Sequence, residues 1–164
     1  MSVCLLSDVQ LVEAGTAAEL EQIRRLFRAY ADWLAVDLCF QGFEQELSLL
    51  PGCYAPPAGR LLLARVGGEA AGCVGLRSLE SGICEMKRLW VEPGFGGRGL
   101  GRALAEAIIE AAREIGYVKM RLDTFQDRMP AAQHLYQSLG FREIAPYYHN
   151  PFEGVVMLEL ELRR

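Results

Sequence analysis

The chain has 164 residues, of which 51% are apolar, and we expect it to form one compact domain over residues 1–164. It carries 17 basic and 21 acidic residues, a net charge of −4, without a run of Lys or Arg. This composition argues against nucleic acid as a partner and against a polybasic membrane anchor.

The five cysteines form no Cys-x-x-Cys pair, and only two histidines could join them as metal ligands. This pattern favours reduced thiols packed as small apolar groups and predicts no metal site. The N-terminus lacks a basic region followed by a long apolar run, and no segment reaches about 18 uninterrupted apolar residues. We therefore expect a soluble, cytoplasmic protein without a membrane partner.

The first half of the chain predicts one strand, two helices and a hairpin. The strand is expected at Val9–Glu13, followed by a helix with an apolar stripe at Ala17–Leu34 and a shorter helix at Phe43–Leu50. Two apolar runs joined by a pair of glycines, Arg60–Val66 and Ala70–Arg77, are expected to form an antiparallel hairpin.

The second half of the chain alternates strands and helices. Strands are expected at Ile83–Val91 and Tyr117–Thr124, and helices at Gly99–Ile115 and Pro130–Leu139. Two further strands complete the set: Phe141–Ile144 and Gly154–Leu162. This order predicts the α/β (α+β) class, with a mixed, mostly antiparallel central sheet of about six to seven strands and helices on both faces.

The most informative stretch of the sequence is the loop Gly94–Arg102, which lies between an apolar run and a predicted helix. Its five glycines allow the backbone to approach a ligand without Cβ clashes, and the helix behind them leaves its first N–H groups unpaired. Such a helix start attracts anions. The loop therefore predicts a site for a pyrophosphate.

Two other phosphate-binding motifs fit this loop less well. A P-loop requires Gly-Lys-Ser/Thr at the helix start, but Gly99–Gly101 contains leucine in place of the lysine and lacks the magnesium-binding hydroxyl. A dinucleotide fingerprint is formally present as Gly94, Gly96 and Gly99, with Asp123 as the ribose-binding acid. The predicted antiparallel hairpin before the motif argues against this interpretation.

Two segments carry a resemblance to a known family. Val91–Leu104 resembles the acetyl-CoA motif of the GNAT superfamily of N-acetyltransferases, Val-x-Pro-x-x-Gln/Arg-Gly-x-Gly-Ile/Leu-Gly-x-x-Leu. Ala132–Phe141 is similar to the second element of that superfamily, Ala-x-x-Leu-Tyr-x-x-x-Gly-Phe. The chain departs from the pattern at Gly96, where the family has Gln or Arg, and at Met129, where the family often has asparagine.

The resemblance implies the GNAT fold and acetyl-CoA as co-substrate, with neither a metal nor a covalent intermediate. We expect acetyl transfer to a primary amine of a small molecule or peptide. Two alternatives stay open, a protein N-acetyltransferase and a non-catalytic module that binds or senses acyl-CoA. A homodimer is common in the family. The residues expected to hold the coenzyme are Leu89, Trp90, Val91, Gly96, Gly97, Arg98, Gly99, Leu100, Gly101, Arg102 and Tyr136.

Amine acetylation needs a proton acceptor, because alkyl amines are almost wholly protonated at neutral pH. Glu85 matches the position of the catalytic glutamate in protein-acetylating members of the family, and we expect it to be the general base. Strand alternation predicts that Glu85, Lys87, Leu89 and Val91 share one face. Two alternatives are that Glu85 only pairs with Lys87 or an arginine, and that His149 is the base.

The resemblance also implies a general acid. Tyr136 lies where the superfamily commonly carries this residue, and its phenol can protonate the leaving thiolate. We expect the thioester oxygen to accept a hydrogen bond from a backbone N–H within Leu89–Val91, where family strands splay apart.

By resemblance, the first two helices and the last loop wall the acceptor pocket. Aromatic surfaces combined with carboxylates suit a cationic amine. The residues expected there are Tyr30, Trp33, Phe40, Tyr147, Tyr148 and Asn150, with Asp37, Phe43, Glu44 and His149 beside them.

Overall fold

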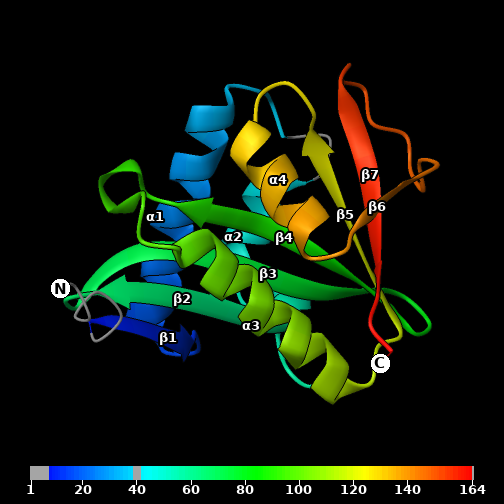
Figure 1. Cartoon of the computed structure of the whole chain (residues 1–164). Helices are drawn as coiled ribbons and strands as arrows, with labels where there is room; N and C mark the ends of the chain where they lie inside the picture. Colours follow the sequence, from blue (N-terminus) through cyan, green and yellow to red (C-terminus); the bar gives the residue numbers. More distant parts are fainter. Residues whose placement is uncertain (1–7, 39–41, 164) are drawn as a thin grey trace, which may run out of the picture.

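A computed structural model describes residues 8–38 and 42–163. Its centre is a seven-stranded sheet with the order β1-β2-β3-β4-β5-β7-β6 (Figure 1). The strands are β1 (Val9–Glu13), β2 (Arg60–Val66), β3 (Glu69–Glu80), β4 (Ile83–Val91), β5 (Lys119–Phe125), β6 (Arg142–Ile144) and β7 (Val155–Glu161). Neighbouring strands are antiparallel except β4 and β5, which are parallel. The predicted mixed, mostly antiparallel sheet is confirmed.

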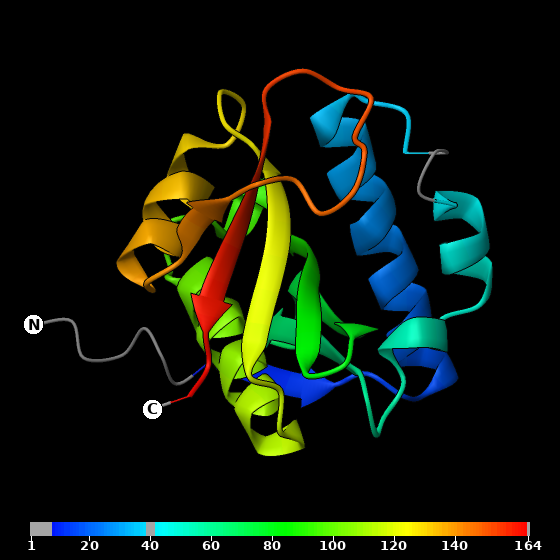
Figure 2. The same ribbon diagram turned by 90° about the vertical axis from the view of Figure 1, so that its right-hand side faces the viewer.

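Helices cover both faces of this sheet. α1 (Ala17–Leu34) and α2 (Phe43–Ser48) lie on one face, and α3 (Leu100–Ile115) and α4 (Pro130–Ser138) lie on the other (Figures 1 and 2). α2 ends slightly before the predicted Leu50. Within the described ranges, no helix is long and apolar enough to span a membrane.

Local sequence signals account for the helix starts. At α1, Thr16 and Glu19 form a capping box: Oγ1 of Thr16 accepts from the Glu19 N–H at 3.2 Å, and Oε1 of Glu19 accepts from the Thr16 N–H at 2.9 Å. α4 begins at Pro130, whose missing N–H is not needed in the first turn. α3 begins after Gly99, without a side-chain cap.

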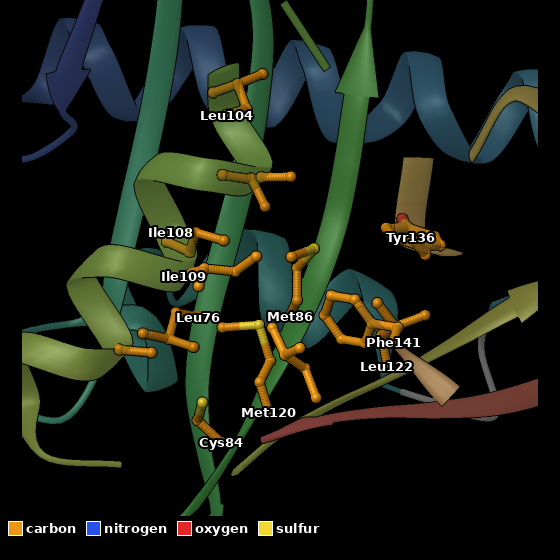
Figure 3. Close-up of a cluster of buried hydrophobic side chains, with 14 of the residues drawn as sticks. Leu76, Cys84, Met86, Leu104, Ile108, Ile109, Met120, Leu122, Tyr136 and Phe141 are labelled. Atoms are coloured by element: carbon orange, nitrogen blue, oxygen red, sulfur yellow. The ribbon is translucent and has the colours of Figure 1, made fainter. Parts of the chain in front are cut away.

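Each face of the sheet has its own apolar core. Under α3 and α4, the core includes Leu76, Met86, Leu104, Ile108, Met120 and Leu122 (Figure 3). Tyr136 belongs to the same core and packs edge-on against Phe141, with ring centroids 5.6 Å apart. Under α1 and α2, the core includes Ile23, Phe27, Leu47, Leu61, Leu63 and Trp90. The helices are thus fixed to the sheet on both sides.

A β-bulge interrupts β4. Gly75 of β3 pairs with Lys87, whereas Cys73, two residues earlier, pairs with Trp90, so β4 accommodates one extra residue. Within this stretch Arg88 has a φ of 61°, in the left-handed region. Such a bulge shifts the alternation of side chains between the two faces.

The bulge separates residues that alternation would place together. Leu89 and Val91 pack against the core under α3 and α4. Glu85 and Lys87 face the other side, where they line a cavity with Glu46 of α2. The prediction that Glu85, Lys87, Leu89 and Val91 share one face is therefore wrong, because simple alternation does not allow for the extra residue.

The strands β4 and β5 separate after a short ladder. They pair only over Ile83–Glu85 and Lys119–Arg121. β4 then continues through Met86–Val91, which pairs with β3 on one side and has no strand partner toward β5. Backbone groups along this edge can therefore bind a ligand.

Candidate active site

The glycine loop and the start of α3 form a cradle of backbone N–H groups, here called the phosphate cradle (Gly96–Arg102). Gly97 and Gly99 have φ values of 77° and 75°, a region in which glycine is unstrained. Gly99 is the N-cap of α3, and no side chain caps this end. The N–H groups of the first turn therefore lack helical acceptors and can bind an anion.

Two arginines place positive charge around the phosphate cradle. Arg102 donates to Glu106 at 3.2 Å and to Ser138 of α4 at 2.5 Å, so its guanidinium lies between α3 and α4. Arg98 is exposed on the loop. The cradle thus fits an anion although Gly96 supplies no side chain.

A cavity, here called the gap cavity, occupies the space where β4 and β5 separate. Its lining includes Tyr30, Lys87, Leu89, Asp123, Met129 and Tyr136. Leu89 and Tyr136, both expected to hold the coenzyme, come together here from β4 and α4. Burial raises the pKa of Tyr136 above its ordinary value, so its phenol stays protonated at neutral pH.

The side chain of Trp90 lies on the opposite face, under α1. Its ring centroid is 6.0 Å from that of Tyr30 and 5.5 Å from that of Trp33. Trp33 is 48% exposed and does not line the gap cavity, whereas Tyr30 does. Burial raises the pKa of Tyr30 to about 12. Trp90 is one of the residues expected to hold the coenzyme. Because its side chain lies under α1, it can contact a ligand in the gap cavity only through its backbone.

Glu85 lies in a dense polar network and is only 1% exposed. Its Oε1 accepts a hydrogen bond from Arg77 at 2.8 Å and lies 4.0 Å from Nζ of Lys87. Its Oε2 accepts from the Tyr147 hydroxyl at 2.5 Å. Burial lowers the pKa of Lys87. The cavity beside this network, here called the charged cavity, is lined in part by Glu46, Arg77, Glu85, Lys87, Tyr148 and His149.

The loop between β6 and β7 brings a second tyrosine to a second carboxylate. Tyr148 donates its phenolic hydrogen to Oδ2 of Asp123, and Nδ2 of Asn150 donates to the Tyr148 oxygen at 2.9 Å. The rings of Tyr147 and Tyr148 meet edge-on, with centroids 5.4 Å apart. This loop lies on the α1 side of the sheet (Figure 2). Two of the three predicted loop residues, Tyr147 and Tyr148, therefore meet carboxylates from β4 and β5, and Asn150 supports Tyr148.

A third cavity, here called the apolar cavity, adjoins the gap cavity. Its lining includes the apolar or aromatic residues Tyr30, Leu34, Phe125 and Phe152 and the polar residues Arg88, Asp123, Thr124 and Asn150. Both cavities are lined by Tyr30 and Asp123. The expected acceptor residues Tyr30 and Asn150 thus come together from α1 and the last loop.

The other residues expected around the acceptor lie at the periphery or beyond it. Glu44 forms an ion pair with Arg28 at 3.1 Å on the surface of α2 and α1. Asp37 and His149 are exposed, and His149 lines the charged cavity. Phe40 lies outside the described residues.

A buried ion pair that the sequence analysis missed joins α2 to the sheet. Nε and Nη2 of Arg88 donate to the Glu46 carboxylate, each at 3.1 Å. The Tyr54 hydroxyl donates to the same carboxylate at 3.1 Å, and the Arg88 guanidinium lies 5.2 Å from the centroid of the Phe43 ring. Because 42 residues separate Arg88 from Glu46, no local pattern could pair them.

Asp123 is the other residue that the sequence analysis missed on the acceptor side. It was considered there only as a ribose-binding acid, but it lines both the gap cavity and the apolar cavity. The position of its carboxylate follows from the separation of β4 and β5, which has no local sequence signal. Among residues 8–38 and 42–163, no group of three His, Cys, Asp or Glu side chains could hold a metal ion.

Comparison with known proteins identifies clear relatives. A sequence model described as the acetyltransferase (GNAT) family matches residues 20–141. An uncharacterized N-acetyltransferase of Schizosaccharomyces pombe is 38% identical over 160 residues, covering 96% of this chain and 98% of that protein. The crystal structure of a GNAT-family acetyltransferase from Staphylococcus aureus has a TM-score of 0.78 at 20% identity and covers 94% of this chain and 99% of its own. An acetyltransferase from Salmonella typhimurium, solved with its cofactor acetyl-CoA, has a TM-score of 0.67 at 21% identity and covers 96% of both chains.

Proposed function

The chain belongs to the GNAT family of acetyltransferases, and on this premise we propose that it transfers the acetyl group of acetyl-CoA to a primary amine of a small molecule or peptide. One observation carries the proposal. The gap cavity brings together the free edge of β4, at Leu89, and the buried phenol of Tyr136. A thioester carbonyl and a leaving sulfur could each find a hydrogen-bond donor there.

The phosphate cradle is the proposed site for the pyrophosphate of the coenzyme. An added Cβ at Gly97 or Gly99 would meet no protein atom within 4 Å, so the space in front of the loop is open to a ligand. The unpaired N–H groups at the start of α3 match phosphate oxygens. The bound coenzyme would supply an acetyl group activated as a thioester. The fold shared with the Salmonella protein that was solved with acetyl-CoA supports this choice.

Tyr136 is the proposed general acid. Its raised pKa keeps the phenol protonated, as proton donation to a leaving thiolate requires. A backbone N–H within Leu89–Val91 is the proposed donor to the thioester oxygen. The free edge of β4 next to the gap cavity supports this role.

Glu85 stays the sequence-based candidate for the general base. Both of its carboxylate oxygens have partners in the Arg77, Lys87 and Tyr147 network. It lines the charged cavity, on the side of the last loop. As the base it would have to receive the acceptor's proton through water in that cavity, because it does not line the gap cavity. The cytoplasmic location and the homodimer stay predictions as well.

The proposal is tested by following thiol release from acetyl-CoA with a panel of amines. The panel should contain simple alkyl amines, polyamines, amino acids and short peptides with a free N-terminus, each measured against a blank without amine. We expect at least one amine to accelerate thiol release and to appear as its N-acetyl derivative by mass spectrometry. Coenzyme binding without amine-dependent turnover across the panel would contradict the proposal.

A further inference from the structure

Asp123 is a carboxylate that the gap cavity and the apolar cavity share. It lies two residues beyond Arg121, the last residue of β5 that pairs with β4. Tyr30 lines both cavities with it, and Tyr136 lines the gap cavity. A thioester in the gap cavity and an amine in the apolar cavity would therefore meet beside Asp123.

The last loop holds the Asp123 carboxylate in place. Tyr148 donates to Oδ2 of Asp123, Asn150 donates to the Tyr148 oxygen, and Oδ1 of Asn150 accepts from the backbone N–H of Phe152 at 2.9 Å. Tyr148 thereby gives the Asp123 carboxylate a fixed orientation beside the gap cavity and the apolar cavity.

The charged and titratable groups around Asp123 come from four elements. β4 contributes Lys87 and Arg88, and α1 contributes Tyr30. α4 contributes Tyr136, and the last loop contributes Tyr147 and Tyr148.

Glu85 is placed differently from Asp123. It lines the charged cavity but not the gap cavity, where Leu89 and Tyr136 lie. Arg77 and Tyr147 each donate to one of its two oxygens. A general base must come within hydrogen-bond reach of the proton it removes, directly or through one water. On this criterion Asp123 fits the reaction better than Glu85.

Resting on the function proposed above, we propose that Asp123 is the catalytic residue that binds the acceptor amine and takes its proton. The ammonium form of the acceptor first gives one proton to the Asp123 carboxylate, directly or through water, and Asp123 releases this proton to solvent. The neutral amine nitrogen then forms a bond to the acyl carbon and gives its second proton to Asp123. The carbon–sulfur bond breaks, and the sulfur takes the electron pair and a proton from Tyr136. The products are the N-acetyl amine and the free thiol. Tyr148 and Asn150 act as positioning residues.

The test compares Asp123→Asn with Glu85→Gln, using two probe amines at high concentration. Ethylamine is protonated at neutral pH and needs a base, whereas hydroxylamine is uncharged there and needs one much less. We expect Asp123→Asn to lower kcat/KM for ethylamine about 100-fold at neutral pH, with a much smaller loss for hydroxylamine. For ethylamine, the difference in kcat/KM between the wild-type protein and Asp123→Asn should become smaller as the pH approaches the pKa of the amine. Asp127→Asn, which alters an exposed aspartate on the turn after β5, should change neither rate.

A second measurement does not depend on turnover. Coenzyme A affinity should be unchanged in Asp123→Asn. The alkaline titration of the phenols beside Asp123 should move to lower pH, because Asp123 raises the pKa values of Tyr136, Tyr147 and Tyr148. The contribution of Tyr148, which also donates a hydrogen bond to Asp123, should be missing from the titration of Tyr148→Phe. An unchanged titration in Asp123→Asn would overturn the positioning contact and the inference with it.

The kinetic outcomes separate the inference from the proposed function. If the wild-type protein acetylates amines but Asp123→Asn loses the same factor with both probes at every pH, Asp123 is not the proton acceptor. The inference is equally overturned if Glu85→Gln, and not Asp123→Asn, shows the probe-dependent loss. If the wild-type protein acetylates no amine, the proposed function itself fails, and the inference fails with it.

Discussion

Tyr147 donates its phenolic hydrogen to Oε2 of Glu85 at 2.5 Å, which ties the last loop to β4 in front of the charged cavity. Burial and the neighbouring Glu85 carboxylate raise the pKa of Tyr147 above its ordinary value. The opposite oxygen of Glu85 is held by Arg77. The geometry therefore makes Glu85 a link between a strand and the loop that borders the acceptor.

The first prediction concerns Glu85→Gln. Because this substitution removes the buried charge that faces Arg77 and lies 4.0 Å from Nζ of Lys87, we expect the free energy of unfolding to fall by about 3 kcal/mol in urea titrations. Turnover should fall by the same factor at every pH, as expected for a structural role. Glu143→Gln on the exposed edge strand β6 is the matched control. A turnover deficit confined to neutral pH would identify Glu85 as the base.

The second prediction separates coenzyme binding from folding at Gly101. An added Cβ there would meet only Leu135 and Val91 side-chain carbons at 3.9 Å, an ordinary contact distance. Alanine also has a higher helix propensity than glycine by about 1 kcal/mol. Gly101→Ala should therefore keep or raise the Tm of the free protein while it weakens coenzyme A affinity at least about tenfold, which corresponds to ~1.4 kcal/mol. Calorimetric titration measures the affinity.

The control for this prediction is Gly94→Ala. An added Cβ at Gly94 would meet no protein atom within 4 Å, and Gly94 lies before the phosphate cradle. Its coenzyme A affinity should match that of the wild-type protein. Equal affinities in all three proteins would mean that the phosphates bind elsewhere.

The third prediction concerns Tyr136→Phe. The change removes a proton donor from the gap cavity while it keeps the ring that packs on Phe141. Coenzyme A affinity should be retained, and thiol release should fall about 100-fold. Tyr117→Phe is the control, since the Tyr117 hydroxyl bonds the Ala58 carbonyl outside the gap cavity. If only the coenzyme A affinity changes, Tyr136 positions the coenzyme and is not the proton donor.

The fourth prediction compares two glutamates on α2. Glu46→Gln leaves the buried Arg88 guanidinium without a charged partner, and the free energy of unfolding should fall by about 3 kcal/mol. Glu44→Gln breaks a pair with Arg28 whose side chains are 66% and 55% exposed, so stability should hardly change because water screens such pairs. Denaturant titrations give both values. If the free energy of unfolding falls equally in the two variants, the buried pair of Arg88 with Glu46 does not stabilise the packing of α2 on the sheet.

The fifth prediction is a loss of stability at alkaline pH. Burial raises the pKa values of Tyr136, Tyr147 and Tyr148, so the folded protein keeps phenolic protons that the unfolded chain releases above about pH 10. Stability is therefore fully present below that pH and is lost as the pH rises toward the raised values. Lys87 acts in the opposite direction, because burial lowers its pKa, but it is one group, and burial raises the pKa values of Tyr30 and Tyr54 as well.

Urea titrations between about pH 8 and pH 11, with phenolate absorbance recorded in parallel, follow this loss. Tyr148→Phe should reduce the alkaline loss of stability because it removes one of the three groups. If the free energy of unfolding does not change over this pH range, the phenols of Tyr136, Tyr147 and Tyr148 are solvated in the folded protein.

The periodicity and the turn residues of the sequence determined the elements of the fold. The apolar spacing of α3, the glycines before it and the proline of α4 act over a few residues, so they can be interpreted without knowledge of the fold. The family resemblance also predicted that Tyr136 and Leu89 serve the same ligand, and both line the gap cavity.

Only the tertiary structure decided which carboxylate lines the gap cavity. The bulge at Arg88 changes the face of every later side chain in β4, and the contact of Asp123 with Tyr148 joins residues 25 positions apart. The ion pair of Arg88 with Glu46 spans 42 positions. Such contacts depend on strand register and on where two strands separate. These are properties of the packed sheet as a whole, so no local segment of the sequence carries them.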